Sequence, residues 1–319
     1  MNTQTCKIGQ TSDADLPDWG DGGFILPDAP IGDAATDVPT PDGNIVIIED
    51  PVRVCRFIPP PGEFSPQMKC RWNGSPNYSE YDDGVMTPVV ANINDDNGDG
   101  RIDTRDIPDV LFVSYRLRED GCCNAPGVLR VISGRCNEDG SVMEHFSVAT
   151  PFLDNSAGLA VGDIDGDGVP DIVGMTRTSG TVAFSNTGAM KWTSPYPNGA
   201  DILTAVQPSI TDLDGDGIAE VLVGRVVLDG ATGTIRWRGV GGLGINAFLG
   251  PMSFAADIDI DGRPEVIAGN TVYRADGQLL WQFAYPSANS GCQSMGKPCD
   301  GYSAVANFDE NPEAEIVIV

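Results

Sequence analysis

The sequence predicts an all-β protein built from repeated units, and three observations support this. The 319 residues include 39 Gly and 24 Pro, a content typical of many turns and few long helices. No segment sustains the 3.6-residue hydrophobic period of an amphipathic helix, whereas short β-branched runs recur along the chain. One acidic motif appears five times between such runs. We therefore expect little helix, and sheets whose arrangement follows the repeat.

The first 80 residues precede the repeats and divide into two predicted parts. Residues 1–50 are rich in Asp, Pro and Gly, which predicts an extended acidic arm. Its residues 45–48 (Ile-Val-Ile-Ile) favour a strand, paired either within the chain, which we favour, or on a neighbour's sheet edge. Residues 51–80 hold Pro59-Pro60-Pro61, two cysteines and the sequons at Asn73 and Asn77. They predict a cystine-pinned, glycosylated segment that leads into the repeats at residues 81–319.

Eight cysteines favour disulfides, because their number is even and their spacing matches no zinc site. The alternative is a cytosolic protein with reduced thiols, which fits this pattern less well. Plausible pairs are Cys55 with Cys70, Cys292 with Cys299, and either Cys122 or Cys123 with Cys136. Sequence alone leaves the pairing open. Together with the sequons, the cysteines predict a secreted or cell-surface protein.

The five acidic segments begin at residues 95, 163, 212, 257 and 307, so they are 68, 49, 45 and 50 residues apart. This is the period of a β-propeller blade. Each segment follows a small or apolar run and precedes a short β-branched run, such as residues 110–113 or 221–223. Each acidic segment is therefore predicted to be a loop between two strands, in a propeller of four-stranded blades.

A second signature lies further along three of the units and ends in Trp192, Trp237 or Trp281. In each unit a glycine (Gly188, Gly233 or Gly277) precedes the tryptophan by four residues. A glycine at a tight turn indicates a hairpin. A cofactor role for the tryptophans is conceivable, but packing between neighbouring blades is the better interpretation.

The acidic loops carry oxygen side chains at positions 1, 3, 5 and 9 and, in four of them, a glycine at position 6 that permits a tight turn. Calcium accepts about six to eight oxygens with loose geometry, whereas magnesium requires an octahedron, so we predict calcium. The predicted ligands in the first two loops are Asp95, Asn97, Asp99, Arg101, Asp103, Asp163, Asp165, Asp167, Val169 and Asp171. Those in the next two are Asp212, Asp214, Asp216, Ile218, Glu220, Asp257, Asp259, Asp261, Arg263 and Glu265. In all four loops the residue at position 7 is predicted to bind through its backbone carbonyl.

The fifth loop is degenerate, with Asn307, Asp309, Asn311 and Glu315 as oxygen ligands and Pro312 in place of the glycine. We expect about four calcium sites, with weak or no binding in the fifth. An Asp/Gly-rich turn is the plain alternative for one such loop, but four near-intact copies argue against it. The loops resemble the first half of an EF-hand, yet they lack its closing Glu and its flanking helices.

The D-x-D-x-D-G-x-x-D/E loops between short strands resemble the FG-GAP, or VCBS-type, repeats of integrin α-subunit propellers and bacterial exoproteins. The resemblance covers about residues 81–319. It implies a calcium-binding propeller used for adhesion or ligand recognition, and in some members a lectin or lyase domain. The usual propeller of this kind has seven blades. Either blades without metal loops complete it here or, as we prefer, the natural chain continues past Val319.

Composition and motifs argue against several classes of function. Acidic residues outnumber basic ones 46 to 19, and a net charge of −27 would repel nucleic acid and anionic membranes. No apolar run approaches the roughly 18–20 residues that a transmembrane segment needs. The only histidine, His145, has no nucleophile motif nearby, so no enzyme is predicted.

We therefore expect an adhesion or structural module whose partner is a protein or glycan at the cell surface or in the matrix. One alternative is a filament subunit that self-assembles through the N-terminal arm. A second is a carbohydrate-binding or polysaccharide-acting propeller, which a screen on glycans would distinguish from the other two.

Overall fold

The computed structural model describes residues 67–123, 125–177, 180–195, 205–246, 249–283, 300–308 and 314–319. The chain divides into two units, Met1–Gln67 and Met68–Val319, and all the described residues except Gln67 belong to the second. The predicted arm, its strand-like residues 45–48, and Cys55, Cys292 and Cys299 lie outside the described residues.

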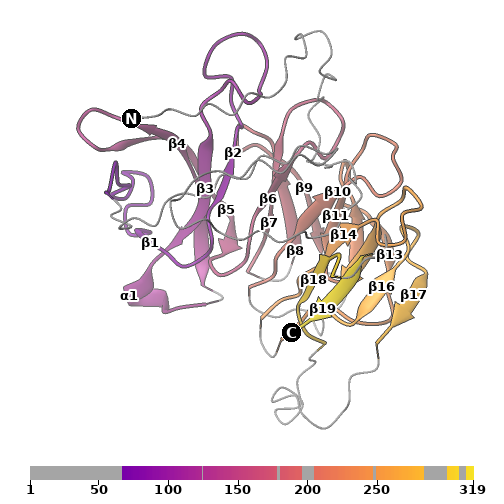
Figure 1. Ribbon diagram of the computed structural model, residues 1–319. Coiled ribbons are helices and arrows are strands. Elements are labelled where there is room, and N and C mark those ends of the chain that lie inside the picture. The colour runs from indigo at the N-terminus through magenta and orange to yellow at the C-terminus, as the bar shows by residue number, and fades with distance from the viewer. Residues whose placement is uncertain are drawn as a thin grey trace, which may run out of the picture. The chain divides into compact units, whose positions relative to one another are not determined.

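The described part of the second unit is all-β, as predicted, and consists of antiparallel sheets that follow one another along the chain (Figure 1). The first sheet contains β1 (Asp83–Gly84), β2 (Val89–Ala91), β3 (Asp109–Tyr115), β4 (Pro126–Cys136) and β5 (Val142–Asp154). In the first sheet β1 and β2 both pair with β3, and in the other sheets the strands pair in chain order. The only described helix is α1 (Leu117–Asp120). Within the described ranges, no helix has the length and apolar character needed to cross a bilayer.

Three four-stranded sheets and a two-stranded sheet follow the first. The second sheet contains β6 (Ala160–Gly162), β7 (Asp171–Met175), β8 (Gly180–Phe184) and β9 (Met190–Pro195). The third contains β10 (Ser209–Thr211), β11 (Glu220–Val223), β12 (Val226–Asp229) and β13 (Ile235–Arg238). The fourth contains β14 (Phe254–Ala256), β15 (Glu265–Ala268), β16 (Thr271–Tyr273) and β17 (Leu279–Gln282), and the fifth β18 (Ser303–Ala306) and β19 (Glu315–Ile318).

Each of the first four acidic segments connects two paired strands, which confirms its prediction as a loop between strands. In the second, third and fourth sheets the last residue of the motif is also the first residue of the following strand. There it pairs with the last residue of the preceding strand, as Asp171 does with Gly162 and Glu220 with Thr211. The loops therefore hold corresponding places in these sheets.

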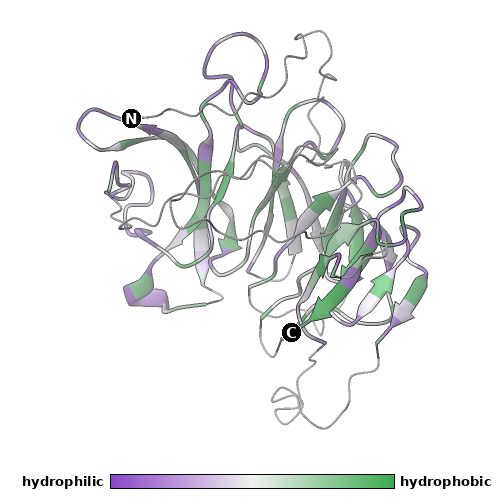
Figure 2. Ribbon diagram, viewed as in Figure 1, coloured by the Kyte–Doolittle hydropathy of each residue, from purple (hydrophilic) through white to green (hydrophobic). Residues whose placement is uncertain are grey.

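The strands after the loops form the core. Every residue of β7, β11 and β15 is buried, as their β-branched composition predicts. Figure 2 shows apolar residues gathered on the strands and polar residues in the connecting loops. Apolar clusters span consecutive sheets: one joins the first sheet to the second, another the second to the third, and two more join the later sheets. Each sheet therefore shares its core with the next.

Two of the three hairpin tryptophans, Trp192 and Trp237, pack between sheets, as predicted, whereas Trp281 is exposed. Trp192 on β9 donates its Nε1–H to the carbonyl of Gly230 in the third sheet at 2.7 Å. A Cβ at Gly233 would lie 2.4 Å from this indole, so only glycine fits. Trp237 repeats the arrangement on the fourth sheet, where it donates to the carbonyl of Ala275 at 2.8 Å and crowds Gly277.

The residues just before β1 are fixed to the first sheet by the guanidinium of Arg130. This side chain is fully buried and donates hydrogen bonds to the carbonyls of Asn77, Tyr78 and Tyr81 at 2.8, 3.0 and 3.2 Å. A buried cation must have its donors satisfied, and backbone carbonyls do so here. Residues 68–81 are therefore part of the same compact unit as the repeats.

The disulfides differ from two of the predicted pairs. Cys70 pairs with Cys136, and not with Cys55, because the segment before β1 runs beside the end of β4, where Arg71 donates to the carbonyl of Gly140. Cys122 and Cys123 pair with each other just after α1, so neither reaches Cys136. The pairing predicted from short sequence separations is wrong here because the segment before β1 packs beside a strand whose cysteine is 66 residues away.

Candidate metal centres

The aspartate at position 1 shapes each of the first four loops by accepting backbone hydrogen bonds. In the second loop, Asp163 accepts the N–H of Gly166 and the N–H of Gly168, both at 2.8 Å. The equivalent bonds to Asp95, Asp212 and Asp257 come from Gly100, Gly217 and Gly262 at 2.8, 3.0 and 2.9 Å. The backbone is therefore curled around a carboxylate before any ion is considered.

Position 6 needs glycine because its φ is positive. The φ values at Gly100, Gly168, Gly217 and Gly262 are 85°, 80°, 88° and 87°. Position 4 is also left-handed, and the fourth loop places Ile260 there at φ 59°. A β-branched residue in this conformation is strained. The fourth loop is thus less relaxed than the other three.

The carboxylates of positions 1, 3 and 9 come together in three loops. The groups are Asp163, Asp165 and Asp171; Asp212, Asp214 and Glu220; and Asp257, Asp259 and Glu265, and in each the ligand oxygens lie within 4.8 Å of one another. Like charges this close repel, and a hard cation would neutralise them. The three groups are therefore candidate metal centres at corresponding places in three sheets.

The position-9 carboxylates are buried at the base of these groups. Glu220 accepts the N–H of Leu213 at 2.8 Å, and Glu265 accepts the N–H of Ile258 at 3.1 Å. Burial raises the pKa of Asp171, Glu220 and Glu265 because it disfavours their charged forms. In the second loop, Oδ1 of Asp165 is buried and has no hydrogen-bond partner among the described residues. This orphaned acceptor fits a site for a cation.

The position-5 aspartates lie outside the three groups. Asp99, Asp167, Asp216 and Asp261 accept the N–H of position 7 at 3.0, 2.8, 2.8 and 2.9 Å. These bonds turn the second half of each loop. The roles of position 5 and of the carbonyls of Arg101, Val169, Ile218 and Arg263 as ligands stay predictions.

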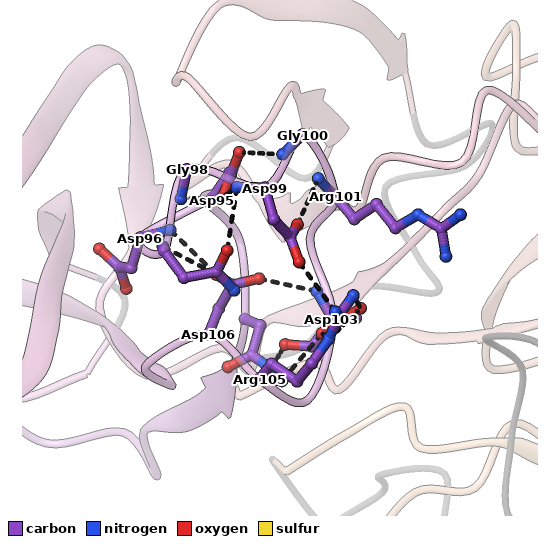
Figure 3. A network of polar contacts seen from close by, with 11 residues as sticks. Asp95, Asp96, Gly98, Asp99, Gly100, Arg101, Asp103, Arg105 and Asp106 are labelled. Carbon is purple, nitrogen blue, oxygen red and sulfur yellow. Dashed lines mark hydrogen bonds and ion pairs between the residues drawn. The ribbon is translucent and has the colours of Figure 1, made fainter.

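The first loop has the same motif but different contacts (Figure 3). Asp103, its position 9, forms hydrogen bonds with Arg105, which lower its pKa to about 2, and Arg105 also contacts Asp99 at 3.0 Å. The buried Asp106 accepts the N–H groups of Asp96 and Asp103 at 3.0 and 2.9 Å. In the first loop the position-9 carboxylate is thus paired with an arginine, whereas in the next three loops it belongs to a three-carboxylate group.

Asp109 occupies the position-9 place in the first sheet. It is fully buried, pairs with Ala91 across the strands, and accepts the N–H of Ile93 at 3.2 Å, as Glu220 and Glu265 do in their loops. Its other oxygen lies 2.8 Å from His145 Nε2. The motif spacing missed this residue because residues 104–108 lengthen the first loop.

The fifth loop is only partly described. Glu315 accepts the N–H of Phe308 at 2.7 Å, which matches the arrangement of Glu220. Asn307 lies at the start of this loop, while Asp309 and Asn311 lie outside the described residues. Whether these four residues act together is therefore still a prediction.

Two basic residues next to the candidate centres were not predicted. Lys191 Nζ lies 2.6 Å from Asp165 Oδ2 and 2.7 Å from Asp171 Oδ2. Arg236 contacts Asp214 at 2.6 Å and also pairs with Glu220. Each residue directly precedes a hairpin tryptophan, so an alignment on the tryptophans would have shown them.

Comparison with known families confirms the predicted resemblance. Residues 163–223, which hold the second and third acidic loops, match the model of an FG-GAP-like repeat. A search of curated protein sequences finds no match to the chain.

A search of solved structures also finds matches. The structure of the V. cholerae biofilm matrix protein Bap1 matches 79% of this chain, with a TM-score of 0.62 and 25% sequence identity. The rhamnogalacturonan lyases YesX and YesW match 80% and 68% of it, with TM-scores of 0.45 and 0.39 and identities of 16% and 21%. The chain covers 38%, 48% and 34% of the lengths of Bap1, YesX and YesW, so it spans less than half of each.

Proposed function

We propose that this protein is a calcium-binding β-propeller that acts as an extracellular matrix or adhesion module. The observation that carries the proposal is the recurrence of one three-carboxylate group at the same place in three consecutive sheets. The likeness to a biofilm matrix protein supports the functional class.

Two features support the propeller arrangement. Consecutive sheets share apolar cores in chain order, as blades do. The tryptophan of one outer strand also packs on the hairpin glycine of the next sheet, first through Trp192 and Gly233 and then through Trp237 and Gly277. Such a repeated sheet-to-sheet contact fits a radial array of blades, with the acidic loops on one rim.

Calcium fits the donor set better than the other common divalent ions. All candidate side-chain ligands are oxygens, which excludes a site built for a soft metal. A loop of backbone and carboxylate oxygens tolerates calcium's irregular shell more easily than the octahedron of magnesium. Bound calcium would supply positive charge. Asp163, Asp165 and Asp171 would hold it in the second loop, with equivalent residues in the third and fourth, and so fix adjacent strands of each sheet to each other.

The test of the calcium proposal is a thermal melt of the full chain in chelator, in calcium and in magnesium. A ligand at about 100 times its Kd stabilises the folded state by about 2.7 kcal/mol per site, so calcium should raise the Tm clearly and magnesium much less. Asp163→Asn should remove part of this gain. Glu138→Gln, at an exposed turn away from the loops, should retain all of it. Equal responses to calcium and magnesium would contradict the proposal.

The adhesion role requires a separate test, because metal binding alone does not establish it. Beads coated with the protein should be retained by an extracellular polysaccharide or protein matrix in calcium and released by chelator. No catalytic role is proposed, and the single histidine, His145, is engaged by the buried Asp109. Retention that is unaffected by chelator would show that adhesion does not depend on metal binding in the acidic loops.

A further inference from the structure

The outermost strand of each of the first four sheets contains a β-bulge at the same place. In β9, Met190 and Trp192 pair with the neighbouring residues Phe184 and Ala183, so Lys191 is the extra residue. The registers of β13, β17 and β5 place Arg236, Leu280 and His145 in the same position. A bulge turns one side chain away from the regular alternation of the strand.

In the second and third sheets the bulge residue places a positive charge against the loop. The ammonium of Lys191 touches one oxygen of Asp165 and one of Asp171 at 2.6 and 2.7 Å. Arg236 bridges Asp214 and Glu220 in the same way. Each of these loops therefore has a tethered cation between positions 3 and 9.

The fourth sheet lacks this cation. Its bulge residue, Leu280, packs against an apolar cluster that includes Ile258. Among the described residues, no basic side chain pairs with Glu265, which accepts the N–H of Ile258. Arg263 lies in the same loop, but it is exposed and no ion pair joins it to a described carboxylate. The carboxylates of the fourth loop thus face one another uncompensated.

We infer that the bulge residue before the hairpin tryptophan sets how strongly each loop depends on calcium. A tethered ammonium or guanidinium offsets carboxylate repulsion in the metal-free loop, and it weakens calcium binding because it lies beside the same oxygens. The loops at 163–171 and 212–220 therefore keep their shape without metal and bind calcium less tightly. The loop at 257–265 binds calcium more tightly and depends on it for its shape.

This inference rests on the proposed calcium function and adds a rule that distinguishes the loops. Nothing in the acidic motif itself predicts the difference, since the second, third and fourth loops each carry four acidic residues at the motif positions. The difference comes from one residue about 20 positions further along the chain. The bulge residue can therefore be changed while the carboxylates stay intact.

The experiment uses the full chain and compares Lys191→Met and Arg236→Met with wild type. Methionine keeps most of the apolar stem and removes the charge. Each variant should melt a few degrees lower in chelator. Each should also gain more from calcium, with an apparent affinity higher on the order of tenfold in calorimetric titration. Lys69→Met, which removes an exposed lysine outside the loops, is the charge control and should behave as wild type.

The converse variant is Leu280→Lys, with Leu280→Met as the control for lost packing. The lysine should reduce the calcium-induced gain in Tm relative to the methionine variant. Site assignment comes from the double variant Asp163→Asn with Lys191→Met, in which the effect of Lys191 on the calcium gain should disappear because the loop no longer binds.

Three results would overturn the inference. If Lys191→Met lowers calcium affinity, the lysine positions the ligands instead of opposing the ion. If the calcium gain is unchanged in all charge variants, the bulge residue has no part in binding. If wild type itself shows no calcium response, the proposed function fails and the inference fails with it.

Discussion

Asp103 in the first loop and Asp171 in the second hold the same position in the same motif, yet their surroundings differ. The side chain of Asp103 is 20% exposed and paired with Arg105, whose hydrogen bonds lower its pKa to about 2. Asp171 is 2% exposed, and burial raises its pKa in spite of Lys191. The same motif therefore occurs in two kinds of loop. In the second sheet the motif's own position 9, Asp171, is the buried first residue of the following strand, whereas in the first sheet Asp109 holds that place and Asp103 stays in the loop.

The largest expected effect concerns Asp109, which holds in the first sheet the buried place that Asp171 holds in the second. Asp109→Ala should destabilise the protein by about 2–4 kcal/mol even in chelator, because it leaves the buried N–H of Ile93 and the ring of His145 without their partner. Urea unfolding would measure the loss.

The matched control is Asp103→Ala, which removes the position-9 residue of the same motif. Its partner Arg105 is exposed, so solvent screens the pair and the cost should be much smaller than that of Asp109→Ala. If Asp103→Ala costs as much as Asp109→Ala, the first loop is closed by Asp103 and the comparison is wrong.

The second prediction tests whether the two kinds of loop respond differently to metal. Asp163→Asn should abolish one site's share of the calcium gain, about 2–3 kcal/mol at about 100 times Kd. Asp95→Asn should remove less, because Arg105 pairs with Asp99 and Asp103 and, among the described residues, the first loop has no three-carboxylate group. Thermal melts at fixed free calcium compare the two. Equal losses would show that the first loop binds calcium as the second does.

The sequence predicted much of the fold because the determining features are local. Glycine at a left-handed position, a β-branched run after each loop, and a tryptophan four residues after a turn glycine all have direct structural consequences. The position of Asp109 was missed because the extra residues 104–108 shift the register without changing the motif. The Cys70–Cys136 pair was missed because it depends on where the segment before β1 packs, which cannot be predicted from the spacing of the cysteines.

The roles of Lys191 and Arg236 were missed for a different physical reason. A strand's alternation predicts which side chains share a face, but a bulge reverses that pattern at one residue. Only the observed register shows that both residues turn toward the acidic loop. Sequence repeats thus predict where a site lies better than they predict its charge.

A smaller effect concerns the backbone of the fourth loop. Ile260 occupies a left-handed position where the other three loops have glycine. Ile260→Gly should relieve strain of about 1–2 kcal/mol, partly offset by the greater backbone entropy of glycine in the unfolded chain. The net gain should be about 0.5–1 kcal/mol in denaturant unfolding. Gly215→Ile in the third loop is the reverse variant and should destabilise. A neutral result for both would mean that position 4 carries no strain.

The smallest effect is a difference in titration between Asp103 and Asp171. Because the pKa of Asp103 is lowered, its pairing with Arg105 contributes stability above its unfolded pKa of 3.8 that is lost as pH falls through about 2. The raised pKa of Asp171 has the opposite sign: its contribution is present below 3.8 and is lost as pH rises through the folded value. Carboxyl carbon NMR in chelator should show Asp103 titrating below the usual range and Asp171 above it. Arg105→Met should return Asp103 toward 3.8 without moving Asp171. If both carboxyls titrate together near 3.8, the two loops do not differ in the way their contacts indicate.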